Sequence, residues 1–83
     1  MLSFDEFCDV LLDRLRVPAP PGLGPEADLY SEVALDSFQA FEMLIVIEAT
    51  AGLDIPPAQI PEIYTLGDAY EYYLHAAELA AQV

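Results

Sequence analysis

Residues 34–39 read Ala-Leu-Asp-Ser-Phe-Gln, and this stretch ends a turn-rich loop and opens the most apolar helical run of the chain. Asp36 and Gln39 stand three residues apart, which is the spacing of a capping box at a helix start. With Asp36 as the cap, Ser37 lies in the first turn, where free backbone N–H groups and the helix dipole favour an anionic group on its hydroxyl. The pattern therefore predicts a displayed serine that suits a phosphate-linked modification.

The helix that follows, which Gly52 ends, is apolar on two opposite sides. One stripe at helical spacing consists of Ala40, Met43, Leu44, Ile47 and Ala51, and the opposite stripe consists of Phe38, Phe41, Glu42, Ile45 and Glu48. A chain of 83 residues has too few other elements to cover both stripes. We therefore expect the second stripe to stay on an exposed rim as a docking surface, where its glutamates guide a basic partner and its apolar residues supply affinity. In the alternative interpretation, Phe38 or Phe41 folds back beneath the loop.

Two more main helices are predicted. Ser3 and Glu6 fit a capping box, and the apolar residues after them recur at helical spacing over residues 4–16. Thr65 and Asp68 fit a third box, and the inner face of the last helix is marked by Leu66, Ala69, Tyr70, Tyr73 and Ala77. The segment before Thr65 is restricted to turns and at most a short helix ending near Tyr64, because it contains Pro56, Pro57 and Pro61.

Prolines and glycines break helical regularity between the first two helices. A connection this long must cross and cover the core, so we expect four of its residues to turn inward: Leu29, Tyr30, Val33 and Leu35. No segment alternates with strand periodicity for long enough to build a sheet. The predicted fold is all-α, a single domain over residues 1–83, with three main helices, one short helix and a long loop between the first and second helices.

Composition indicates the class of partner. The chain has 15 acidic residues against 2 lysines and arginines, which gives a formal net charge of -13. This charge repels nucleic acid and attracts basic protein surfaces. The longest uninterrupted apolar run, residues 43–47, is too short for a membrane span, and no secretory signal is recognisable, so we expect a soluble, cytoplasmic monomer that binds neither nucleic acid nor membrane. Cys8 is the only cysteine and is expected to be a small buried apolar side chain, and no metal site is expected.

The ordered set of motifs resembles the acyl carrier protein family, including its peptidyl and aminoacyl carrier relatives. The resemblance covers nearly the whole chain and is carried by Asp36-Ser37-Phe38, the helix over residues 38–51 with Glu42 and Glu48, the exit Gly52-Leu53-Asp54-Ile55-Pro56, and Thr65-Leu66-Gly67-Asp68. It implies an acyl-carrier-like bundle in which Ser37, supported by Asp36, receives a covalent 4′-phosphopantetheine from coenzyme A. The thiol of this arm then holds an acyl group as a thioester. The implied partners are a phosphopantetheinyl transferase and an acyltransferase, ketosynthase or adenylating ligase with a basic docking surface.

Two positions depart from the pattern of fatty-acid carriers, which commonly have leucine after the serine and a large aromatic residue near the helix end. Phe38 and Ala51 occupy these positions here. The departures favour a role in specialised polyketide or hybrid natural-product biosynthesis. Within the same chemistry, the alternative is an aminoacyl or peptidyl carrier loaded by an adenylating enzyme. From a different class, the alternative is an unmodified acidic helical adaptor that binds a basic protein partner.

Catalysis by Ser37 itself is not expected. A serine nucleophile needs an oriented base and an oxyanion hole. The only histidine, His75, falls midway along the last predicted helix, and Ser37 lacks the glycine-flanked elbow of serine hydrolases. We therefore expect a non-catalytic carrier that is a substrate of other enzymes.

Overall fold

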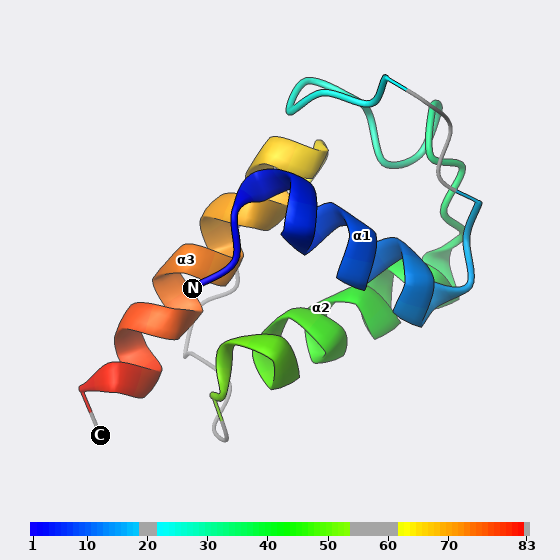
Figure 1. The fold of residues 1–83 in the computed structure, drawn as a ribbon. Coiled ribbons are helices and arrows are strands. Elements are labelled where there is room, and N and C mark those ends of the chain that lie inside the picture. Colours follow the sequence, from blue (N-terminus) through cyan, green and yellow to red (C-terminus); the bar gives the residue numbers. More distant parts are fainter. Residues whose placement is uncertain (19–21, 54–61, 83) are drawn as a thin grey trace.

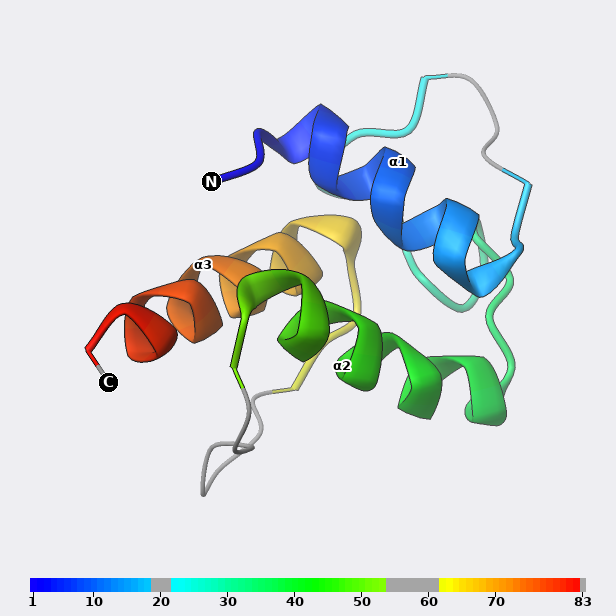
Figure 2. The same cartoon turned by 60° about the horizontal axis from the view of Figure 1, so that its bottom comes forward.

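The computed structural model describes residues 1–18, 22–53 and 62–82. Its helices are α1 (Phe4–Leu15), α2 (Ser37–Ala51) and α3 (Leu66–Ala81), and each of them packs on the other two (Figure 1). Figure 2 shows the same bundle with α1 above α2 and α3. Within the described ranges, strand-type pairing is limited to an isolated antiparallel bridge between Asp28 and Thr65. The predicted all-α class and the three main helices are confirmed.

Each helix begins at a reciprocal capping box, as the sequence predicts. The cap side chain accepts a hydrogen bond from the backbone N–H three residues later, and the side chain at that later position accepts one from the N–H of the cap. The three pairs are Ser3–Glu6, Asp36–Gln39 and Thr65–Asp68. The residue that follows α2 is its C-cap, Gly52, whose φ of 80° lies in the left-handed region that glycine adopts without a Cβ penalty.

One apolar core fills the space between the helices and the loop that covers them. Its most enclosed large side chains are Phe7, Leu11, Leu29, Met43, Ile47, Leu66 and Tyr72. Four aromatic rings join α1 to α3, with neighbouring ring centroids 5.0 to 5.9 Å apart: Phe4, Phe7, Tyr70 and Tyr73. These separations are in the favourable range for aromatic pairs, so the cluster fixes α1 against α3.

The loop between α1 and α2 is held against the start of α3 by backbone hydrogen bonds. The N–H of Leu29 donates to the carbonyl of Tyr64 at 2.8 Å, and the N–H of Leu66 donates to the carbonyl of Ala27 at 3.0 Å. Three apolar side chains of the loop are buried, as predicted: Leu29, Val33 and Leu35. The loop therefore completes the core on the side that the helices leave open.

The prediction that Tyr30 turns inward is wrong. The carboxylate of Asp28 accepts hydrogen bonds from the N–H groups of Tyr30 and Ser31, at 2.8 and 2.9 Å. This tight turn leaves Tyr30 exposed between the buried residues Leu29 and Val33. Local turn chemistry therefore decides the direction of this aromatic side chain.

The inner face of α3 is broader than the sequence pattern predicts. Leu66, Ala69 and Tyr73 are buried, whereas Tyr70 and Ala77 are only half-buried. Tyr72 and Ala76, which the predicted face omits, are buried as well. Both α2 and α1 pack on α3, so the covered part of this helix spans more than one stripe.

The short helix predicted before Thr65 falls mainly in residues 54–61, outside the described residues. Residues 62–64 are described and are not helical. None of the described helices combines the length and the apolar character that crossing a membrane requires.

Candidate functional site

Ser37 is the first residue of α2 and is exposed. The preceding residue, Asp36, has extended backbone geometry, and its Oδ1 accepts a hydrogen bond from the N–H of Gln39 at 2.7 Å. In return, the Oε1 atom of Gln39 accepts one from the N–H of Asp36 at 3.1 Å. The N–H groups of Ser37 and Phe38 have no carbonyl partner within the helix, as at any helix start. An anionic substituent on the Ser37 hydroxyl would therefore lie close to free donors and the positive end of the dipole.

The backbone before Ser37 is held by the core. Leu35 is buried, and its N–H donates to the carbonyl of Leu29 at 2.9 Å. Ala34 has a φ of 64°, a left-handed conformation that costs a non-glycine residue about 1 kcal/mol. The chain thus turns sharply, buries Leu35 and then exposes Ser37 two residues later. A serine presented in this way is accessible to another protein while its backbone position stays defined.

Three large apolar side chains lie exposed along α2, on the turns that follow Ser37. Phe38 is 72% exposed, Phe41 is 66% exposed and Ile45 is 55% exposed. The opposite side of the helix carries the buried residues Met43 and Ile47. The predicted division of α2 into two faces is confirmed, and the alternative in which a phenylalanine folds beneath the loop is wrong. We call Phe38, Phe41 and Ile45 the α2 apolar surface.

The two glutamates of this side differ from the prediction of an exposed rim. Glu42 is half-buried, and so is Glu48. The hydroxyl of the buried Tyr72 donates a hydrogen bond of 2.6 Å to Oε2 of Glu48. Desolvation, together with this hydrogen bond to Glu48, raises the pKa of the Tyr72 phenol above its ordinary value. Glu48 therefore lies at the interface between α2 and α3 and is still partly exposed to solvent, because its carboxylate is bonded to Tyr72 of α3.

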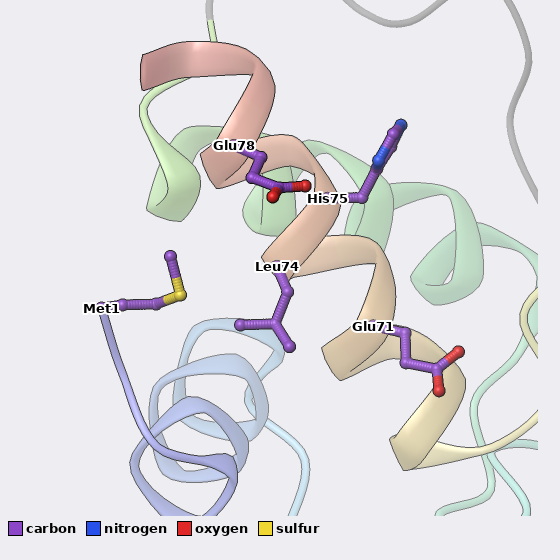
Figure 3. A pocket seen from close by; sticks show the side chains of 5 residues that line it. All are labelled: Met1, Glu71, Leu74, His75 and Glu78. Atoms are coloured by element: carbon purple, nitrogen blue, oxygen red, sulfur yellow. The ribbon is translucent and has the colours of Figure 1, made fainter. Parts of the chain in front are cut away.

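The structure does not place the only histidine beside Ser37. His75 is exposed on α3, where it lines a groove with Met1 and Leu74 (Figure 3). Within the described part of the chain, no three histidine, cysteine, aspartate or glutamate side chains are grouped so as to hold a metal ion. Ser37 therefore has no adjacent imidazole that could take the proton of its hydroxyl.

Two comparisons with known proteins indicate the family to which this chain is similar. Residues 5–73 match the family model described as phosphopantetheine attachment site. Acyl carrier proteins of three Helicobacter pylori strains, G27, HPAG1 and ATCC 700392 / 26695, are each 29% identical to this chain over 72 residues. The aligned region covers 87% of this chain and 91% of each relative. The matched region contains α1 except its first residue, all of α2 with Ser37, and the first half of α3.

Proposed function

Since this chain belongs to the acyl carrier protein family and carries a covalently attached 4′-phosphopantetheine, we propose that Ser37 is the residue to which the arm is joined. The observation that carries this assignment is the exposed position of Ser37 at the first residue of α2, directly after the Asp36 cap. A phosphodiester at this position is anionic, and the start of a helix favours an anion. The residues present therefore fit the group.

We assign the attachment to a separate transferase, because the described part of the chain places no histidine beside Ser37. The Ser37 hydroxyl oxygen forms a new bond to the phosphorus of coenzyme A that carries the pantetheine. The bond from this phosphorus to the rest of coenzyme A breaks, and adenosine bisphosphate leaves. The hydroxyl proton passes to a base of the transferase. When bound, the arm supplies a thiol that holds an acyl group as a thioester. We assign a supporting role at this site to Asp36, whose carboxylate caps α2.

Presentation of the cargo depends on docking. The α2 apolar surface begins one residue after Ser37, so an enzyme that binds it places its active site within reach of the arm. Exposed aromatic and aliphatic anchors supply affinity, and neighbouring carboxylates such as Glu42 attract a basic enzyme surface. A tethered substrate then has a high effective concentration at whichever enzyme is docked. The partners that fit are a phosphopantetheinyl transferase and an acyltransferase, ketosynthase or adenylating ligase.

The pathway that we propose is specialised polyketide or hybrid natural-product biosynthesis. Phe38 supports this proposal, because it places a large exposed aromatic ring next to the attachment serine, where fatty-acid carriers commonly have leucine. Ala51 also supports it, since a small residue ends α2 where those carriers commonly have a large aromatic residue. Loading assays with acyl donors and with aminoacyl adenylates separate this role from that of an aminoacyl or peptidyl carrier.

The deciding experiment is modification by a phosphopantetheinyl transferase with coenzyme A, followed by intact-protein mass spectrometry. We expect complete modification of the wild-type chain. The matched control is Ser31→Ala, which replaces an exposed serine of the loop and should also be modified completely. Ser37→Ala is expected to remain unmodified while its stability changes by less than about 0.5 kcal/mol, because the side chain is exposed. Modification of Ser37→Ala would remove the assignment. An unmodified wild-type chain that still bound a basic protein would favour the adaptor alternative.

A further inference from the structure

A second surface lies on α3, on the side of the molecule away from the start of α2. The residues that line it are Met1, Glu71, Leu74, His75 and Glu78, and they form an open groove (Figure 3). Figure 1 and Figure 2 both show the N-terminus and the second half of α3 at the opposite end of the bundle from the beginning of α2. A molecule bound in this groove would therefore leave Ser37 accessible.

The apolar part of the groove is held in place by hydrogen bonds to the N-terminal backbone. The N–H of Leu2 donates to the hydroxyl of Tyr73 at 2.9 Å, and the hydroxyl of Tyr70 donates to the carbonyl of Leu2 at 2.9 Å. These two bonds fix the position from which Met1 extends beside Leu74 (Figure 3). Met1 is 82% exposed, so its side chain offers apolar contact area at the edge of the groove.

The polar side chains of the groove are Glu71, His75 and Glu78, and the two carboxylates give it an acidic character. Glu71 and Glu78 precede and follow Leu74 by three and four residues, so they share its side of the helix, about 10 Å apart along the axis. Both glutamates are exposed, and the whole chain has a formal net charge of -13. A second copy of the chain, a nucleic acid or an anionic membrane would be repelled by this charge. A basic protein segment is the class of occupant that complements it.

We propose that this groove is a second docking site, which binds a basic amphipathic segment of a partner protein. An aliphatic side chain of the segment packs against Leu74 and Met1, and lysine or arginine side chains on either side of it pair with Glu71 and Glu78. The long aliphatic stems of lysine and arginine add contact with the apolar floor. This interaction goes beyond attachment of the arm, because it holds the carrier beside a partner while Ser37 remains free to engage an enzyme.

The test is an NMR titration of the whole chain, in its unmodified and its arm-bearing form, with a short helical peptide built from leucine and lysine. The background variant Phe41→Ser weakens the α2 apolar surface, so that the groove is observed separately. We expect the amide signals of residues 71–78 and of Leu2 to shift in both forms of the chain. In Glu71→Gln/Glu78→Gln the affinity should fall about fivefold, since each exposed ion pair contributes only a small free energy.

The matched control is Asp9→Asn/Asp13→Asn, which removes the same charge from exposed positions on α1 that are farther along the chain from Met1. We expect the affinity of this variant for the peptide to stay within about twofold of wild type, because solvent and salt screen charges that are distant from the groove. An equal loss in both double variants would show diffuse charge attraction and would overturn the proposal. Shifts confined to residues 38–48, or absent from residues 71–78, would also overturn it. Ser37→Ala leaves the groove intact. Loss of peptide binding in the groove and loss of arm attachment at Ser37 can therefore be observed independently of each other.

Discussion

The hydroxyl of Tyr72 on α3 donates a hydrogen bond of 2.6 Å to the carboxylate of Glu48 on α2, and it joins the two helices at the edge of the core. Tyr72 is 2% exposed, so its phenol needs a polar partner to avoid an unsatisfied buried group. Glu48 supplies that partner from the side of α2 that also carries the exposed residues Phe41 and Ile45. The carboxylate of Glu48 therefore contributes to the packing of α2 on α3 and also lies next to the α2 apolar surface.

Removal of this hydrogen bond should destabilise the fold. In Tyr72→Phe the ring still fills the core, but the Glu48 carboxylate loses its donor, and we expect the free energy of unfolding to fall by about 1–2 kcal/mol. Glu48→Gln is the matched control, because its amide oxygen still accepts the bond and the loss should be smaller. Urea denaturation measures both variants. Equal stability of Tyr72→Phe and wild type would show that the bond contributes nothing to folding.

The two faces of α2 can be distinguished with a pair of identical substitutions. Ile47 is 0% exposed, and Ile47→Ala should lower the free energy of unfolding by about 2–4 kcal/mol, since it removes burial and leaves a cavity. Ile45 is largely exposed, and Ile45→Ala should change stability by less than about 0.5 kcal/mol. Chemical denaturation with a circular dichroism signal compares them. A reversal of the two effects would mean that the faces are assigned the wrong way round.

Much of this architecture follows from local sequence patterns. The capping boxes predict the three helix starts, because a cap needs only two side chains three residues apart. The spacing of apolar residues on α2 predicts that Ile47 is inside and Ile45 outside, since both lie on one regular helix. The position of Ser37 follows from the same two signals.

The features that local patterns do not predict depend on contacts between distant segments. The bond from Tyr72 to Glu48 joins residues 24 positions apart, and nothing in the periodicity of α2 marks Glu48 as partly enclosed. A tyrosine between buried positions of α3 was the available signal, because its hydroxyl must find a partner. The outward turn of Tyr30 was missed because the Asp28 carboxylate, rather than apolar burial, determines the backbone there.

Gly67 permits the loop to approach the first turn of α3. Its N–H donates to the carbonyl of Pro25 at 2.8 Å, and a Cβ atom at this position would lie 2.9 Å from that same oxygen. Gly67→Ala should therefore lower the free energy of unfolding by about 1–2 kcal/mol, despite the better helix propensity of alanine. The measurement is a denaturant midpoint.

The matched control for this substitution is Gly24→Ala. The three heavy atoms nearest to a Cβ there all belong to the flexible carboxylate group of Glu26, so we expect stability to stay equal or to rise slightly. If both variants were as stable as wild type, the close contact between the loop and α3 would carry no energetic weight.

Cys8 should respond to alkaline pH. The thiol is half-buried rather than fully buried as predicted, and desolvation, with smaller contributions from Asp5 and Asp9, raises its pKa to about 11. The folded state therefore favours the neutral thiol. This contribution to stability is complete below the pKa of the unfolded thiol and is lost as pH rises toward the folded value, between about pH 9 and 11.

Two measurements check the behaviour of Cys8. At pH 8 the folded chain should react with iodoacetamide more slowly than the chain in denaturant, because the thiolate is the nucleophile. The thermal midpoint of wild type should also fall more steeply than that of Cys8→Ala over the alkaline range. Equal alkylation rates in the folded and denatured states would contradict the raised pKa.

The proposed docking role of the α2 apolar surface predicts different kinetic effects for its apolar residues and for the carboxylate of Glu42 beside it. Glu42→Lys should slow association with a basic enzyme, since a carboxylate near the anchors steers the encounter, and the effect should shrink in high salt. Ile45→Ala should chiefly speed dissociation, because removal of an apolar anchor weakens the docked complex. Stopped-flow measurement of arm transfer or acyl loading, at low and high salt, separates the two effects.

Glu48→Lys is unsuitable for this test, because it would also break the bond to Tyr72. Circular dichroism melts check that Glu42→Lys and Ile45→Ala remain folded. If both variants transferred the arm or the acyl group at the wild-type rate, the partner would recognise another surface. The exposed side chains Tyr30 and Tyr64 would then be the next residues to test.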